Sequence, residues 1–347
     1  DQGPLTEEQR ARRQDLLRSL PSQTVGAVAA FAAGGCPAPA ALTPPQAPGP
    51  YTALPFRSLL DVVRERLMAI GMNPGGPGPS LARYQPQMRG AVVRWTELID
   101  WASQPRGYRA GLQPLEQVLM AAIEASLREA VIQDVLFADG SRDFESLGLG
   151  FLWVNDRGPA TLAEQTAASV IRMLAQRRRW MGSDADGQPQ PPSYIDSFIE
   201  AAAARAGIAP QVLSADVRSA LGSAVDQWWI ADPDRMFLIA PRPNAQGAVD
   251  EFSCRRCGRA HIQPSAGICI GCGAPLPPPV LRLVLGAPAD YYEYLARCPE
   301  PPFRLNCEEL TGQTDRIDRL LRQRRFQEVF MENEIADVAG VDLLSVT

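Results

Sequence analysis

The sequence contains no lysine, since all 34 of its Lys and Arg residues are arginine, and it contains one histidine, His261. A phosphate-binding P-loop needs a lysine ammonium group on the β- and γ-phosphates. Schiff-base and Ser–Lys chemistry need a lysine amine. These three functions, and metal sites built on two histidines, are therefore excluded for this chain.

The sequence also has little excess charge and no long apolar run. Its net charge of −5 argues against general binding of polyanions, so any contact with nucleic acid must be local. No apolar run approaches the roughly 18–20 residues that span a bilayer. The first residues do not resemble a secretory leader, so we expect a cytoplasmic protein without a membrane partner.

The hydrophobic pattern divides the chain of 347 residues into segments. A helix at 5–20 and the proline-rich stretch 34–55 predict a helix and linker over 1–55. Apolar residues at a spacing of three to four then predict a mostly helical module over 56–248. Its predicted helices are 56–70, 113–137, 161–176, 194–206 and 210–227, with short strands at 151–154 and 236–239.

One glycine- and proline-rich loop, Asn73–Pro79, has two interpretations. Successive glycines can cradle a phosphate with their backbone N–H groups. The same composition is typical of a rigid turn. The rigid turn is favoured because neither a lysine nor a preceding strand accompanies the glycines.

Four of the seven cysteines form two pairs, Cys254-x2-Cys257 and Cys269-x2-Cys272, separated by eleven residues. Two residues between thiolates let a tight turn aim both sulfurs at one ion, and a second turn completes a tetrahedron. We therefore predict a structural zinc ribbon over 249–280. Iron–sulfur ligation, disulfides and reduced thiols are the alternatives.

Several residues near these cysteines have more than one interpretation. His261 could replace one cysteine ligand, but four cysteines make it redundant and favour a structural role. Arg255, Arg256 and Arg259 offset the negative metal–thiolate centre or contact nucleic-acid phosphate. The remaining cysteines, Cys36, Cys298 and Cys307, follow no pairing pattern and are expected to be ordinary small apolar residues.

The last segment, 281–347, alternates strands and helices. The predicted order is a strand at 281–285, a helix at 290–296, a strand at 304–309, a helix after the turn 311–314, and a strand at 341–347. This order is typical of a parallel α/β lobe. The chain starts with Asp1 and stops inside an apolar stretch, so we expect it to be a fragment of a longer protein.

Three short motifs carry a family resemblance. Glu308-Glu309-Leu310-Thr311-Gly312-Gln313-Thr314, Arg324-Arg325-Phe326 and the terminal Val341–Thr347 resemble the second RecA-like lobe of superfamily 2 DEAD/DEAH-box helicases. The upstream zinc ribbon and the segment 291–296 resemble parts of large DNA helicases of bacterial phage defence and DNA repair. The resemblance implies a mixed fold: a helical insertion module, the zinc ribbon and a partial parallel RecA-like lobe.

The resemblance also implies roles for particular residues. Gly312, Gln313, Thr314, Arg324 and Thr347 would contact the DNA backbone weakly and without sequence preference. Amides and hydroxyls of a turn approach a phosphate closely, which suits that role. The other arginines of 316–325 join this basic run or form an ordinary solvated helix face.

The ATP-binding lobe of such a helicase is missing from this sequence. ATP and magnesium would bind only the intact parent protein, whose ATP-binding lobe would be this segment's partner. We expect the chain alone to hydrolyse no ATP. The alternative function is a stand-alone zinc-ribbon adaptor or nucleic-acid-binding module, with a purely structural scaffold as a third possibility.

Overall fold

The computed structural model describes residues 51–86, 92–138, 142–283, 291, 294, 304–332 and 334–346. The predicted helix at 5–20, most of the proline-rich segment, and most of the predicted helix 290–296 lie outside these residues. So do Cys36, Cys298 and Thr347. Among the helices that are described, none is both long enough and apolar enough to cross a membrane.

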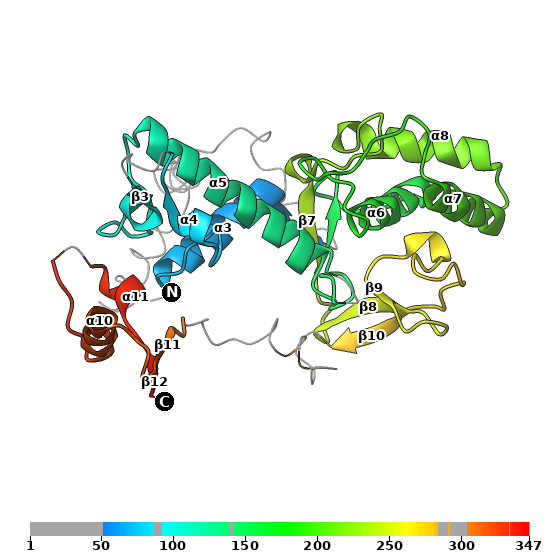
Figure 1. Cartoon of the computed structure of the whole chain (residues 1–347). Coiled ribbons are helices and arrows are strands. Elements are labelled where there is room, and N and C mark those ends of the chain that lie inside the picture. Colours follow the sequence, from blue (N-terminus) through cyan, green and yellow to red (C-terminus); the bar gives the residue numbers. More distant parts are fainter. Residues whose placement is uncertain are drawn as a thin grey trace, which may run out of the picture. The chain divides into compact units, whose positions relative to one another are not determined.

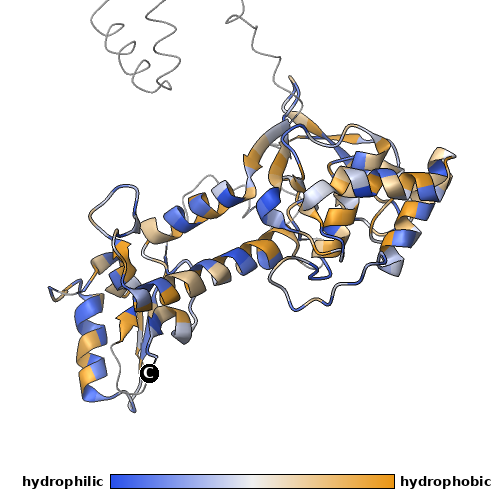
Figure 2. Ribbon diagram, turned by 90° about the horizontal axis from the view of Figure 1, so that it is seen from above, coloured by the Kyte–Doolittle hydropathy of each residue, from blue (hydrophilic) through white to orange (hydrophobic). Residues whose placement is uncertain are grey.

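The helices of the described residues agree largely with the apolar spacing of the sequence (Figure 1). They are α3 Phe56–Ala69, α4 Pro79–Ala82, α5 Pro114–Ala130, α6 Leu162–Ala175, α7 Ser193–Ala206, α8 Pro210–Leu221, α10 Arg316–Phe326 and α11 Ala336–Ala339. A π-helical turn, Val131–Leu136, extends α5. Hydrophilic and hydrophobic residues alternate along the longer helices, as amphipathic packing requires (Figure 2).

Helix ends follow from local sequence chemistry. At the start of α6, Thr161 Oγ1 accepts a hydrogen bond from the N–H of Glu164, and the Glu164 carboxylate accepts one from the N–H of Thr161. The predicted helix 210–227 is too long, because α8 ends at Leu221. Gly222, with φ of +51°, adopts a backbone conformation that does not continue an α-helix.

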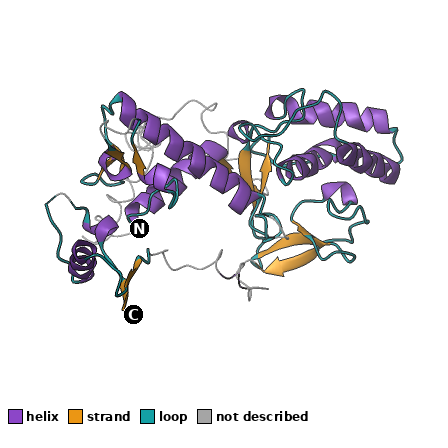
Figure 3. Ribbon diagram, in the orientation of Figure 1, coloured by secondary structure: helices purple, strands orange, loops and turns teal. Residues whose placement is uncertain are grey.

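The strands form several small sheets (Figure 3). The largest have the orders β1-β7-β6 and β10-β8-β9, all antiparallel, and the two-stranded ones are β2-β3, β4-β5 and β11-β12. Their bounds are β1 Tyr51–Pro55, β2 Arg83–Tyr84, β3 Val93–Arg94, β4 Ile99–Asp100, β5 Gly107–Tyr108, β6 Phe151–Trp153, β7 Phe237–Pro241, β8 Ala248–Ser253, β9 Ala260–His261, β10 Val280–Leu283, β11 Cys307–Leu310 and β12 Leu343–Val346.

Two sequence expectations about strands need correction. Residues 51–55 were expected to end the linker, but they form β1 and pair with β7. The strand near Leu281 was expected to open the parallel lobe, but β10 pairs antiparallel with β8. Arg282 on β10 forms an ion pair with Glu251 on β8 at 2.5 Å, which favours this pairing over the expected one.

Only β11 and β12 form a parallel pair among the described strands, with Cys307 opposite Leu343 and Leu310 opposite Val346. Helices α10 and α11 lie between them in sequence, so the two strands and α10 follow the β-α-β order expected from the sequence, with the short α11 added. The described residues therefore have a mixed α and β architecture. The wider parallel lobe implied by the family resemblance remains a prediction.

The main apolar core lies around α6, whose residues from Thr166 to Ala175 are all buried. It joins side chains of α3, α7, α8, β6 and β7. It also includes Ile262, Ala266 and Ile268, which lie between the two cysteine pairs in the sequence. A second core contains Ile123 of α5 together with residues of α3 and the short strands.

The Asn73–Pro79 loop forms a rigid turn packed on α5. Asn73 Oδ1 accepts a hydrogen bond from the N–H of Gly75, and its amide donates to the carbonyl of Leu81. Ser126 donates to the carbonyl of Gly75. A Cβ at Gly75 would lie 3.1 Å from the Cα of Ile123, so the glycine allows this close approach.

Candidate metal centre

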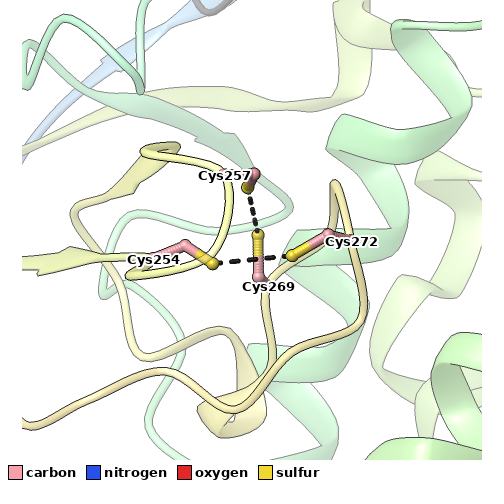
Figure 4. A group of neighbouring side chains, drawn as sticks. All are labelled: Cys254, Cys257, Cys269 and Cys272. Atoms are coloured by element: carbon pink, nitrogen blue, oxygen red, sulfur yellow. Dashed lines mark hydrogen bonds between the residues drawn. The ribbon is translucent and has the colours of Figure 1, made fainter.

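The four cysteines predicted as metal ligands lie together in the structure. The Sγ atoms of Cys254, Cys257, Cys269 and Cys272 all lie within 4.8 Å of one another. Two sulfur pairs, Cys254–Cys272 and Cys257–Cys269, are 3.5 Å apart. All four side chains point toward a common centre (Figure 4).

These sulfur distances fit a tetrahedral metal ion. Four ligands at a zinc–sulfur distance of about 2.3 Å would be roughly 3.8 Å from one another. A disulfide needs a sulfur–sulfur distance of about 2.05 Å, and all four cysteines are free. The disulfide alternative is therefore wrong for these residues, and the cluster can hold a metal ion.

The two pairs have the same backbone geometry. The N–H of Cys254 donates to the carbonyl of Arg259 and the N–H of Gly258 donates to the carbonyl of Cys254, at 2.9 and 2.8 Å. The second pair repeats these bonds. The N–H of Cys269 donates to the carbonyl of Ala274, and the N–H of Gly273 donates to the carbonyl of Cys269, both at 2.9 Å. Both turns end on a glycine in the left-handed region, Gly258 with φ of +74° and Gly273 with φ of +69°. The glycines thus let each turn close beneath its pair of thiols.

The protein environment affects the thiols differently. Burial acts to raise the pKa of Cys254, but hydrogen bonds from the N–H groups of Cys257 and Arg256 outweigh it and bring the pKa to about 7. Burial raises the pKa of Cys269 to about 12. A bound cation would favour the thiolate at every position, because metal ligation deprotonates cysteine.

The spacer between the two pairs is not an exposed loop. His261, Gln263 and Ser265 are fully or almost fully buried, at 0%, 1% and 0% exposure. Ser265, Ala266 and Gly267 all have positive φ, a conformation that non-glycine residues rarely adopt. Surrounding contacts must therefore hold this turn in place.

Helix α6 supplies those contacts. Ser169 Oγ lies 2.7 Å from Ser265 Oγ and accepts a hydrogen bond from the Gln263 amide at 3.0 Å. The Ser265 N–H donates to Gln263 Oε1 at 2.7 Å, and its hydroxyl donates to the carbonyl of Ile268 at 2.8 Å. The strained turn is thus fixed to the helix by hydrogen bonds that are fully buried.

A buried arginine joins the spacer to the rest of the core. Arg172 of α6, which is 2% exposed, forms ion pairs with Asp143 at 2.7 Å and Glu145 at 3.1 Å. The same guanidinium lies 3.3 Å from both the carbonyl of Ala260 and Nδ1 of His261. It also donates to Ser146 at 2.7 Å.

The buried groups around Arg172 have shifted pKa values. Burial raises the pKa of Glu145 to about 7, against the attraction of Arg172. Burial, followed by repulsion from Arg172 and Arg259, lowers the pKa of His261 well below its ordinary value. His261 is therefore neutral and structural, as the sequence favoured, and it is not needed as a metal ligand.

Sequence reasoning did not find Arg172, Asp143 or Glu145. One signal was present: Arg172 lies between Ile171 and Met173, within an otherwise apolar run at the end of α6. A charged residue in such a helix must be paired when it is buried. Its partners lie about thirty and ninety residues away in the sequence, so periodicity does not identify them.

The arginines beside the cysteines divide into two groups. Arg255 and Arg256 are exposed at the first turn. Arg259 is partly buried and donates to the side chain of Gln176, just beyond α6, at 3.0 Å. Arg259 is thus another contact between the cysteine turns and the helical core.

The residues expected to contact nucleic acid lie in a different part of the described chain. Gly312 and Gln313 are exposed in the turn after β11. Thr311 and Thr314 close that turn, with the N–H of Thr311 donating to Thr314 Oγ1 at 2.8 Å and the N–H of Thr314 donating to the carbonyl of Thr311 at 3.0 Å.

Arg324 is not free for a phosphate in this structure. It donates two hydrogen bonds to the Glu334 carboxylate, at 2.7 and 2.9 Å, and Arg325 donates to the same carboxylate. Hydrogen bonds from Arg324 and the Met331 N–H bring the pKa of Glu334 to about 2. By contrast, the guanidinium groups of Arg316 and Arg319 have no partner among the described residues.

Comparisons of the chain with family models, with curated proteins and with solved structures give no match.

Proposed function

We propose that this chain is part of an ATP-dependent DNA helicase or translocase. In this proposal it supplies a grip on the nucleic-acid backbone and a zinc-stabilised scaffold, and it does not hydrolyse ATP itself. ATP and magnesium would act on a separate lobe of the parent protein. The observation that carries the proposal is the position of the Thr311–Thr314 turn on a parallel β-α-β unit.

That turn follows the carboxyl end of β11 and precedes the amino end of α10. Ligands of parallel α/β folds bind at the carboxyl ends of the strands, where loop amides and helix N-termini favour anions. Gly312 places no side chain in the way of its backbone amide, and Gln313 is exposed beside it. These features suit contact with a phosphate group rather than with a base edge.

Arg316 and Arg319, which have no partner among the described residues, add positive charge near this turn, and Asp315 and Asp318 partly offset it. Arg316 and Arg319 lie in the first turns of the helix, both exposed. Each phosphate contact made by an arginine adds affinity that falls with salt concentration. We therefore assign backbone contacts to the turn and to these two arginines ahead of Arg324.

The proposed metal is zinc with a structural role. Four thiolates fill all four positions of a tetrahedral ion and leave none for a substrate or water. When bound, zinc would hold the two cysteine turns together. The second function considered, a stand-alone adaptor that docks through its ribbon, is less well supported, because the spacer between the cysteine pairs is buried against α6.

The direct test is binding of the chain to a fluorescent single-stranded DNA oligonucleotide, measured by polarisation at several salt concentrations. The variant Gln313→Glu changes one exposed side chain almost isosterically and adds a negative charge at the turn. We expect it to weaken binding at least fivefold at low salt.

The matched control is Gln323→Glu, the same substitution at an exposed position later on α10. It should weaken binding by less than twofold. Equal affinities for wild type and Gln313→Glu, or equal losses in both variants, would contradict the assignment of the turn.

A further inference from the structure

The residues between the two cysteine pairs link the metal centre to helix α6. Seven of the nine residues from His261 to Cys269 are buried. Their polar groups bond to Ser169 and Arg172, which lie three residues apart on one face of α6. This arrangement differs from a zinc ribbon that folds as a separate module.

We infer that Arg172, which is not a metal ligand, is a positioning residue for the four-cysteine centre. Its guanidinium holds the start of the spacer at Ala260 and His261, directly after the first cysteine turn. Ser169 holds the left-handed turn at Ser265, directly before the second pair. The inference rests on the proposed zinc site, because it concerns how that site is preorganised.

The two contacts fix both ends of the spacer. Cys257 lies three residues before Ala260, and Cys269 lies four residues after Ser265. A ligand set that is already in place loses little conformational entropy when the ion binds, whereas a mobile one must be ordered first. Removal of the Arg172 or Ser169 side chain, each of which anchors one end of the spacer, should therefore weaken metal binding although neither is a metal ligand.

Buried charge makes Arg172 the stronger of the two anchors. It forms ion pairs with Asp143 and Glu145 while it also reaches the spacer. Without it, buried carboxylates lose their partner, and the segment that carries them must rearrange. The same rearrangement releases Ala260 and His261, so the charge network and the metal centre are coupled.

The coupling must be reciprocal. If docking of α6 improves metal binding, then metal binding must stabilise the contacts of α6 by the same free energy. Removal of the metal should thus speed hydrogen exchange at the backbone amides of α6, the helix that covers the spacer. Amides of α5, which packs mainly in the second core, should change much less.

The first experiment measures zinc affinity of the full chain by competition with a chromophoric chelator. We expect Arg172→Met to weaken zinc binding at least tenfold. The matched control is Arg179→Met, because Arg179 donates to the carbonyls of Asp186, Trp228 and Trp229 and not to the spacer. It should change the affinity by less than twofold.

A general loss of stability must be separated from positioning. Ile123→Ala lowers the stability of the second core and leaves the spacer contacts intact, so it should retain the wild-type zinc affinity. If Arg172→Met does not fold, Ser169→Ala removes only one hydroxyl and should weaken zinc binding about threefold. A folded Arg172→Met or Ser169→Ala protein with wild-type zinc affinity overturns the inference.

The second experiment is hydrogen exchange of the wild-type chain with zinc and with excess chelator. Faster exchange in α6, with little change in α5, supports the coupling. Equal protection of α6 in both states overturns it. A wild-type chain that binds no zinc would overturn the proposed zinc site and this inference together, whereas zinc binding that is insensitive to Arg172 overturns the inference alone.

Discussion

The guanidinium of Arg172 lies 3.3 Å from Nδ1 of His261, although the two residues are 89 positions apart in the sequence. Arg172 belongs to the most buried of the described helices, and His261 follows the first cysteine pair. This contact joins a segment expected to be a small separate ribbon to the main core. The four-cysteine centre is therefore built into the fold around α6.

Replacement of one cysteine ligand should remove the metal and destabilise the fold. We expect Cys269→Ser to abolish stoichiometric zinc binding. A site held at about 1,000 times its Kd contributes ~4 kcal/mol. Its loss should lower Tm by roughly 8–16 °C for a domain of this size. Calorimetry and metal analysis of the purified variant check both results.

The control for that experiment is Cys307→Ser. Cys307 is also free, but it is exposed on β11 and is not part of the four-cysteine cluster. Its zinc content and Tm should equal those of wild type. A similar loss of zinc in both variants would contradict the ligand assignment.

The raised pKa of Glu145 predicts a particular pH dependence of stability. In the folded protein its pKa is about 7, compared with 4.5 as the ordinary value. Between these values the folded state binds more protons than the unfolded state, so this group lowers stability as pH rises, by at most ~1.4 kcal/mol per pH unit. Glu145→Gln removes the effect.

The difference in unfolding free energy between Glu145→Gln and wild type should therefore grow from pH 4.5 to about 7 and level off above that. Chemical denaturation at saturating zinc measures it. The comparison cancels other titrating groups, including His261, which acts in the opposite direction because burial lowers its pKa. A difference that stays constant with pH would show that the pKa of Glu145 is not raised by folding.

Local sequence patterns predicted much of the secondary structure and the cluster of four cysteines. Helix α6 follows from its apolar spacing and its Thr161–Glu164 cap, and the two Cys-x2-Cys turns follow from ligand spacing. These features depend on residues that are close in sequence. The pairing of β10 with β8 and the partners of Arg172 depend on distant residues, and no local pattern encodes them.

The family resemblance implies which residues would contact phosphate, but it does not show what those residues contact in this structure. Arg324 matched a motif, yet its partner Glu334 lies ten residues later, beyond the motif. Motif spacing does not show which arginine of α10 is already neutralised. The structure was needed to separate Arg324, which is paired with Glu334, from Arg319, which has no partner among the described residues.

Close packing at Gly75 predicts a specific stability change. Gly75→Ala would place a Cβ 3.1 Å from the Cα of Ile123, so it should cost ~1–3 kcal/mol of unfolding free energy. Gly78→Ala is the matched control, because its Cβ would lie 3.6 Å from a Leu81 methyl group at an ordinary distance. Gly78→Ala should change stability by less than about 0.5 kcal/mol. Urea unfolding distinguishes the two, and equal effects would contradict the packing.

The arginines of α10 should differ in their effects on DNA binding. Arg319→Ala removes an exposed charge that has no partner among the described residues, so it should reduce the salt dependence of binding by about one ion equivalent. Arg324→Ala removes a group already paired with Glu334 and should leave that slope unchanged. Titrations with single-stranded DNA across salt concentrations test this. If Arg324→Ala reduces the salt dependence and Arg319→Ala does not, then Arg324 rather than Arg319 contacts the phosphate.

We propose that one zinc ion, held by four thiolates, stabilises this fold. X-ray absorption at the zinc edge of the purified full chain, combined with metal analysis, tests it most directly. We expect one zinc per chain with four sulfur neighbours at about 2.3 Å. A purified chain that carries no zinc, or a zinc shell that contains nitrogen or oxygen ligands, would contradict it.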